Sequence, residues 1–238
     1  MAADSTLTGA LLVPLVRSDP VGPRITYYDD ATGERIELSA VTLANWAAKT
    51  ANLLRDELGA GPGSRVAVLL PAHWQTAAVY FGIWWIGAEA VLEGQADLAL
   101  CTSARLQEAD DAVGMGEIAV LSLDPFGKPV ADLPVGLTDY ATAVRVHGDQ
   151  VVPEAAPGPA LEGRSIADLL TAARDNAAAS GMTSAARVWS AGTWDSPEEV
   201  VKNLLAAFAV GGSLVQVANP DPEAQDRRRQ IEKVTLSL

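Results

Sequence analysis

The stretch Ser64–Leu92, SRVAVLLPAHWQTAAVYFGIWWIGAEAVL, decides the fold. After its first residue, Arg65–Leu70 is a continuous apolar run that a proline ends, which is typical of a buried strand. Trp74–Ile86 carries apolar and aromatic residues at helical spacing, and Gly87 favours the end of that helix. Ala88–Leu92 is a second short apolar run. A strand, a helix and a strand in this order need a crossover connection, so we predict a largely parallel sheet.

Regular elements are expected on both sides of this stretch. Ile25–Asp29 and Glu34–Leu38 flank a turn that contains Gly33, which predicts a hairpin. Ser165 is suited to cap a helix, and Ser196 with Glu199 forms a capping box before another. We therefore predict an α/β fold of layered, mostly parallel sheets flanked by helices. Its expected parts are an entry segment at 1–24, a first βα lobe at 25–123, a proline-rich connecting segment at 124–164 and a second βα lobe at 165–238.

Composition excludes several classes of function. The 238 residues carry a formal net charge of −13, which argues against a basic surface for nucleic acid or anionic lipid. No run approaches the ~20 apolar residues that span a bilayer. The single cysteine, Cys101, cannot form an internal disulfide, so we predict a cytoplasmic protein that binds neither nucleic acid nor membrane. Cys101 lies in an apolar run and is expected to be a buried thiol rather than a nucleophile.

Several segments together resemble the adenylate-forming enzymes, the group of acyl- and aryl-CoA synthetases, luciferases and peptide-synthetase adenylation domains. Gly61–Ala67 is similar to the turn and strand near the start of those proteins, with Ser64 where Asp is usual. Gly87-Ala88 stands where the family has a Gly-Ala pair, and Val200–Val217 and Ile231–Leu238 resemble later elements. Pro71 is followed by alanine instead of the usual asparagine. The resemblance implies the fold of the N-terminal subdomains of that family.

The resemblance also implies a phosphate loop rich in Ser, Thr and Gly before the helix at Ser165–Ser180. The residues in that position, 151–164, are VVPEAAPGPALEGR. Three prolines lack amide donors, Glu154 and Glu162 would repel a triphosphate, and no Ser, Thr or Lys is present. None of the lysines at 49, 128, 202 and 233 stands in a context that matches the family's catalytic lysine. We therefore assign no catalytic residue and no cofactor.

Histidines and a tryptophan-rich loop provide the remaining candidates. His73 and His147 lack Cys or carboxylate neighbours at ligand spacing, so no metal site is assigned. His73 is expected to be a polar helix cap or a pocket-wall residue. The stretch 189–195, WSAGTWD, falls where the related enzymes place a loop that lines the acyl pocket. Thr193, Trp194 and Asp195 are therefore possible pocket-lining residues, and packing within the loop is the alternative.

Aromatic side chains crowd the helix at 74–86. Trp74, Tyr80, Trp84 and Trp85 cannot all lie on one helical face, so they either fill a core between two layers or leave a face for a partner or ligand. A homodimer joined by the tryptophans or by an open sheet edge is one possibility.

Two hypotheses of function follow. The first is a non-catalytic protein that has a fold like that of the adenylate-forming enzymes and a binding or interaction role. Its partner would be an unknown small molecule, either a nucleotide or an acyl compound. The alternative is an AMP-dependent acyl or aryl ligase, of the AMP-forming acid–thiol class, or a nucleotide- or acyl-binding protein, completed by a partner chain.

Overall fold

Two five-stranded sheets form the framework of the computed structural model, which describes residues 5–238. Sheet A has the order β10-β8-β9-β1-β2, and sheet B has the order β4-β3-β5-β6-β7. The bounds in sheet A are β1 (Pro23–Asp29), β2 (Glu34–Ser39), β8 (Arg187–Ser190), β9 (Ser213–Ala218) and β10 (Leu236–Ser237). Those in sheet B are β3 (Arg65–Leu69), β4 (Glu89–Val91), β5 (Leu98–Thr102), β6 (Glu117–Leu121) and β7 (Thr138–Asp139). Only the β1–β2 pair is antiparallel among these strands, so the predicted α/β fold with mostly parallel sheets is confirmed.

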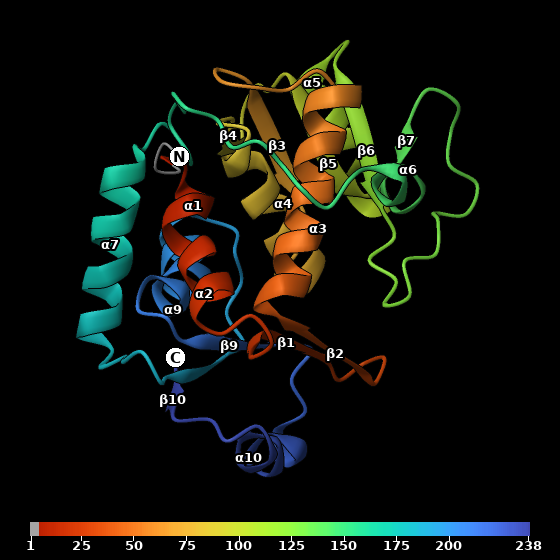
Figure 1. Cartoon of the computed structure of the whole chain (residues 1–238). Helices are drawn as coiled ribbons and strands as arrows, with labels where there is room; N and C mark the ends of the chain where they lie inside the picture. Colours follow the sequence, from red (N-terminus) through yellow and green to blue (C-terminus); the bar gives the residue numbers. More distant parts are fainter. Residues whose placement is uncertain (1–4) are drawn as a thin grey trace.

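Helices cover the sheets and fill the space between them (Figure 1). α3 packs on β1 and β2 of sheet A, while α4 contacts β1 of sheet A and β3 and β4 of sheet B. α5 packs on sheet B, and α9 packs on β9. The helices are α1 (Leu7–Leu11), α2 (Val13–Ser18), α3 (Ala40–Asn52), α4 (Trp74–Trp85), α5 (Leu106–Val113), α6 (Tyr140–Val146), α7 (Ile166–Ala179), α8 (Pro197–Val200), α9 (Ala206–Ala209) and α10 (Pro222–Ile231). π-helical turns at Leu53–Glu57 and Val201–Leu205 extend α3 and join α8 to α9.

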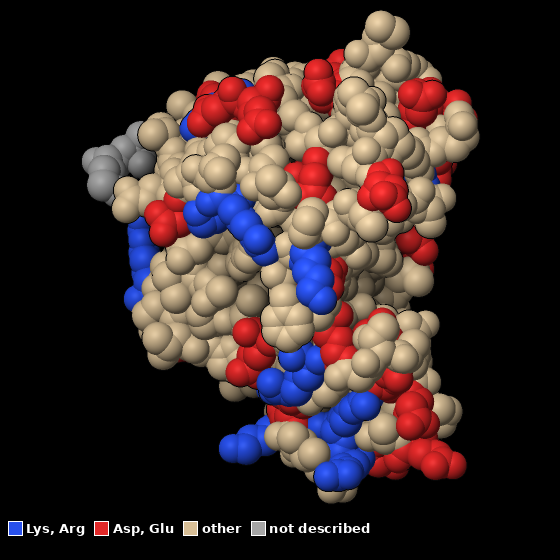
Figure 2. Space-filling view, turned by 90° about the vertical axis from the view of Figure 1, so that its right-hand side faces the viewer, with Lys and Arg blue, Asp and Glu red and all other residues tan. Residues whose placement is uncertain are grey.

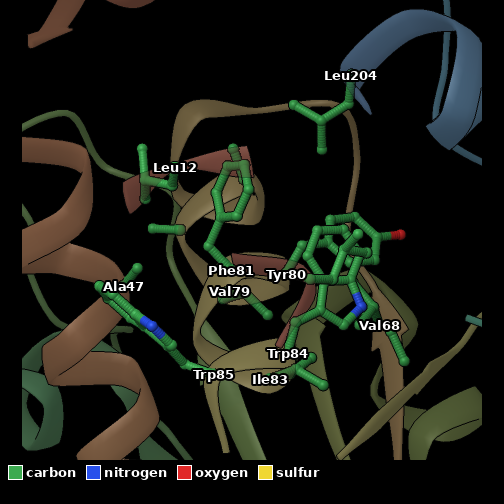
Figure 3. Packing of buried hydrophobic residues seen from close by; sticks show 14 of the residues in the cluster. Leu12, Ala47, Val68, Val79, Tyr80, Phe81, Ile83, Trp84, Trp85 and Leu204 are labelled. Carbon is green, nitrogen blue, oxygen red and sulfur yellow. The ribbon is translucent and has the colours of Figure 1, made fainter. Parts of the chain in front are cut away.

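The central helix α4 is buried on every side. All twelve of its residues are buried, as expected for a helix that is apolar all round. Figure 3 shows its side chains pointing outward in several directions, with Leu12, Val68 and Leu204 of other elements around them. Trp84 and Trp85 are 1% and 8% exposed. The core interpretation of the aromatic helix is therefore confirmed.

The first hairpin, β1–β2, lies in a different sheet from the one that our expected division implied. We placed it in the first lobe at 25–123, but β1 pairs in parallel with β9, with Ile25 opposite Leu214. The physical reason is that β1 is buried at five consecutive positions, a pattern that requires cover on both faces and a partner on each edge. Sheet A therefore joins the two ends of the described chain.

A buried carboxylate fastens the end of α10 to sheet A. Glu232 is 4% exposed and accepts hydrogen bonds from the hydroxyl of Tyr28 at 2.5 Å and from Nε and a terminal nitrogen of Arg35 at 3.0 and 2.9 Å. The guanidinium of Arg187 also donates to it. On α10 itself, Arg229 lies 5.1 Å from the ring centre of Trp189. Arg229 therefore packs on the sheet as well as facing solvent.

Candidate functional site

The carboxyl ends of strands from both sheets meet along one side of the molecule. A groove of about 940 Å³, here called the edge groove, lies there. It is lined from sheet A by Asp29 at the end of β1 and by Asn219 after β9, and from sheet B by His73 after β3 and by 122–129 after β6. Figure 2 faces the side of the molecule that carries β7 and α6, where acidic and basic side chains are interspersed. In open α/β sheets, ligands bind at this edge, beyond the carboxyl ends of the strands.

His73 forms one wall of the edge groove and begins α4. Its Nδ1 accepts a hydrogen bond from the amide of Gln75 at 3.1 Å, so the neutral ring carries its proton on Nε2. That Nε2 is buried and has no hydrogen-bond partner among the described residues, because Oε1 of Glu34 is 3.7 Å away. Burial lowers the pKa of His73, while Glu34 opposes this effect. His73 is therefore an uncharged cap with one unused donor.

Two residues of the edge groove have an unusual backbone. Leu123 and Asn219 have φ of 56° and 47°, in the left-handed region that residues with a side chain seldom adopt. Leu123 follows β6, and Asn219 follows β9. Such conformations persist only where the surrounding structure imposes them, and they concentrate at functional sites.

A second, smaller cavity lies farther along the same edge. This tryptophan cavity has a volume of about 300 Å³ and is lined by Val68, Leu70, Leu92, Arg105, Trp194 and Asp195. Trp194 is 1% exposed, and its Nε1 has no hydrogen-bond partner among the described residues. Arg105 pairs with Glu108 at 2.6 Å. The cavity thus combines an unused buried N–H with one cation and one carboxylate.

The predicted pocket residues divide between these two places. Trp194 and Asp195 line the tryptophan cavity, and His73 lines the edge groove. Thr193 lines neither, because its hydroxyl donates to Glu199 at 2.8 Å and its carbonyl accepts from Asn203 at 2.9 Å. Thr193 therefore holds the loop onto the start of α8.

Sequence reasoning missed the other residues of both cavities. Leu92 follows β4, Arg105 follows β5, and Asp29 is the last residue of β1. Their common signal is a position at or just after the carboxyl end of a strand of a parallel sheet, a rule that applies once the strands are assigned.

Residues 151–164, here called the strap, lie along β4 at the edge of sheet B. Ala90 of β4 forms a parallel bridge with Leu161, and Nε1 of Trp84 donates to the carbonyl of Ala160 at 2.7 Å. The amides of Glu154, Gly158 and Glu162 donate to the carbonyls of Trp85, Gly87 and Ala90 at 3.0, 3.2 and 3.1 Å. Other strap amides bond within the strap or to β4, namely those of Ala156, Ala160, Gly163 and Arg164. The strap therefore covers an open sheet edge. Its backbone amides donate to the protein itself, whereas those of a phosphate loop would donate to a nucleotide.

The strap glutamates also bind the backbone. Glu162 has φ of 44°, and its carboxylate accepts from the amide of Leu92 at 2.5 Å. Glu154 accepts from the amide of Ala156 at 2.9 Å. Both carboxylates fix the path of the chain.

Other kinds of site lack support in the described part of the chain. Residues 5–238 contain no group of three or more His, Cys, Asp or Glu placed to hold a metal ion. None of the helices described is both long and apolar enough to cross a bilayer. Cys101 is fully buried on β5, and burial raises the pKa of its thiol to about 11, which keeps it protonated at neutral pH.

Comparison with solved structures defines the class of fold. No family model matches the chain. An acyl-CoA synthetase of Brucella canis superposes with a TM-score of 0.81 at 17% identity, over 99% of this chain and 47% of that one. The anthranilate CoA ligase AuaEII, solved with anthranoyl-AMP, superposes with a TM-score of 0.76 at 14% identity, over 99% of this chain and 49% of that one. Apo MbtA of Mycobacterium smegmatis superposes with a TM-score of 0.76 at 20% identity, over 98% of this chain and 48% of that one. The chain has the fold of adenylate-forming enzymes and spans about half the length of these solved chains.

A close relative identifies the family. A "TIGR03089 family protein" of Mycobacterium tuberculosis (strain ATCC 25618 / H37Rv) is 67% identical over 243 residues, which cover 100% of both chains. The chain belongs to the TIGR03089 family.

Proposed function

We propose that this chain is a non-catalytic protein with an adenylate-forming fold, which binds a small ligand at the carboxyl edge of its two sheets. The observation that carries the first part is the hydrogen bonding of the strap. Acyl activation by the ordinary route needs backbone amides and hydroxyls that grip the phosphates of ATP. The strap has no hydroxyl side chain, and most of its amides donate to the protein itself.

The binding role is supported by two buried donors at the same edge. Nε1 of Trp194 and Nε2 of His73 have no hydrogen-bond partner among the described residues, and each belongs to a cavity wall. A buried donor without a partner costs about 1–3 kcal/mol, which a ligand with an acceptor oxygen would relieve. We infer a ligand that carries such oxygens, either an acyl compound with its carboxylate or a nucleotide with its phosphates.

A thermal-shift screen tests the binding role, with ATP, AMP, CoA, acyl-adenylate mimics, and fatty and aryl acids as probes. A ligand at one hundred times its dissociation constant adds about 2.7 kcal/mol to the free energy of unfolding, which raises the melting temperature visibly. Trp194→Phe keeps the ring and removes the N–H, and should weaken such a ligand about fivefold to tenfold. Trp189→Phe, on β8 just before the loop of Trp194 and outside both cavities, is the matched control.

Turnover tests the non-catalytic part. We expect no exchange of pyrophosphate into ATP and no AMP from the pure protein with any carboxylate in that panel. Formation of AMP above the rate of a blank would refute this part, and a panel without any melting shift would refute the binding role.

A further inference from the structure

A third cavity lies between α3 and α6 and shares Pro125 and Phe126 with the edge groove. This aromatic cavity has a volume of about 380 Å³. Its walls include the rings of Trp46, Trp74 and Phe126 and the cationic side chains of Lys49 and Arg145. Its volume is in the range of pockets that hold small molecules. The function proposed above does not use it.

The charge of the aromatic cavity is opposite to that of the chain. The net charge of the protein is −13, yet no Asp or Glu belongs to the lining of this cavity. Nζ of Lys49 donates to the carbonyl of His147 at 2.5 Å. One terminal nitrogen of Arg145 donates to the carbonyls of Phe126 and Gly127 at 2.9 and 2.5 Å. Neither cation is ion-paired with a carboxylate among residues 5–238, so both positive charges are compensated only by backbone dipoles.

The aromatic rings give the cavity a second property. Trp46 and Trp74 meet edge to face, with ring centres 5.5 Å apart and planes at 68°. Nε1 of Trp74 donates to Glu34 at 3.3 Å. Phe126 is 80% exposed, which is costly for so large an apolar side chain. A flat apolar group in the cavity would cover Phe126 and pack on Trp46.

We propose that the aromatic cavity binds a small aromatic oxyanion, an aryl group that carries a carboxylate or a phosphate. The aryl group packs between Trp46 and Phe126, and the oxyanion pairs with Lys49 and with the guanidinium nitrogens of Arg145 that hold no carbonyl. A planar guanidinium suits both carboxylate and phosphate, because both present two oxygens to its parallel N–H groups. Arg145 also donates hydrogen bonds to the backbone carbonyls of Phe126 and Gly127, so the bound anion would lie next to the 122–129 loop.

Calorimetric titration of the full chain tests this proposal with three probes of equal ring size. 2-Naphthoate and 2-naphthyl phosphate carry the oxyanion, and 2-naphthamide is the neutral match. We expect the neutral probe to bind at least tenfold more weakly than the tighter of the two anions. We also expect the anion's affinity to fall as sodium chloride rises from 50 to 500 mM. The stronger of the two anions identifies the chemistry of the natural ligand.

Variants locate the bound probe. Lys49→Gln and Arg145→Gln should each weaken the anions at least fivefold, and Phe126→Ala, an exposed position where folding is not at stake, should weaken all naphthyl probes. Arg174→Gln makes the same change of charge on α7, where Arg174 is exposed, and should leave the affinity unchanged. Equal binding of the neutral probe, no saturable binding of either anion below 5 mM, or full affinity in the Phe126→Ala and Lys49→Gln variants would overturn the proposal.

Discussion

The carboxylate of Glu232 should contribute strongly to the stability of this protein, because it pairs with two arginines. Glu232→Gln removes the charge that Arg35 and Arg187 share, and it leaves Arg187, 13% exposed, without its buried partner. We expect the free energy of unfolding to fall by about 2–3 kcal/mol, measured by urea denaturation. Glu117→Gln, an exposed position on β6, is the control and should change it by less than ~0.5 kcal/mol. A loss below 1 kcal/mol for Glu232→Gln would show that the pairing contributes little.

The same residue gives the stability a dependence on pH. Burial opposes the charged form, but hydrogen bonds from Tyr28, Arg187 and Arg35 hold the pKa of Glu232 below its ordinary value of 4.5. The unfolded chain therefore takes up a proton at higher pH than the folded one. This contribution is fully present above pH 4.5 and is lost as the pH falls through the folded-state pKa. The difference in stability between wild type and Glu232→Gln should accordingly shrink between pH 6 and pH 3, and a constant difference would contradict the assignment.

Single residues also show how far the sequence could predict the site. Trp194 and His73 could be proposed from local signals: the loop of Trp194 falls where the related enzymes line the acyl pocket, and His73 stands at the start of a helix. Thr193 has the same local signal, but its hydroxyl is taken by Glu199, six residues later. Lys49 and Arg145 meet at one cavity from α3 and α6. No pattern along the chain indicates that these two residues line the same cavity.

At the level of elements, the close approach of α3 and α4 depends on one glycine. A Cβ at Gly82 would lie 2.8 Å from Cβ of Thr50 and 3.0 Å from the carbonyl oxygen of Ala47, so the helices would have to separate. Gly82→Ala should therefore destabilise the protein by about 1–3 kcal/mol, although alanine favours the helix, measured as the midpoint of urea denaturation.

A second glycine provides the matched control for that change. A Cβ at Gly61 would have nothing within 4 Å, and Gly61→Ala should be neutral or stabilise slightly. If the Gly82→Ala variant unfolds at the same urea concentration as the Gly61→Ala variant, α3 and α4 can accommodate a Cβ between them, which would contradict the structure.

Most elements could be predicted because their signals are local. The Ser165 and Ser196 caps both accept from the amide three residues on, as the capping patterns indicated. The sheet to which a strand belongs could not be predicted, because β1 pairs with β9, nearly 190 residues later. The strap was expected to be a connecting segment for the same reason, since backbone pairing with β4 leaves no periodic pattern in its own side chains.

At the level of the whole molecule, the two sheets should unfold as one unit. α4 packs on both sheets, and sheet A contains strands from both ends of the described chain. The single thiol of Cys101, fully buried in sheet B, reports on this because reagents reach it only after unfolding. We expect labelling in native buffer to be at least ~1,000-fold slower than in 8 M urea, and labelling and tryptophan fluorescence to change at the same urea concentration.

Two separate transitions would contradict this expectation. If Cys101 reacts at a urea concentration at which the tryptophan fluorescence is still native, sheet B opens on its own, and the sheets are independent domains as the expected lobes at 25–123 and 165–238 would suggest.

The proposed loss of acyl activation depends on whether the strap amides are committed to the protein itself. Hydrogen exchange of the backbone amides of Glu154, Gly158, Ala160 and Glu162, with and without Mg·ATP, measures this directly. The structure predicts exchange at least ~100-fold slower than at Val135, a fully exposed loop residue, and no change beyond twofold when Mg·ATP is added. Strap amides that exchange as fast as Val135, or that become protected only in the presence of Mg·ATP, would show a phosphate-binding loop instead of a closed sheet edge.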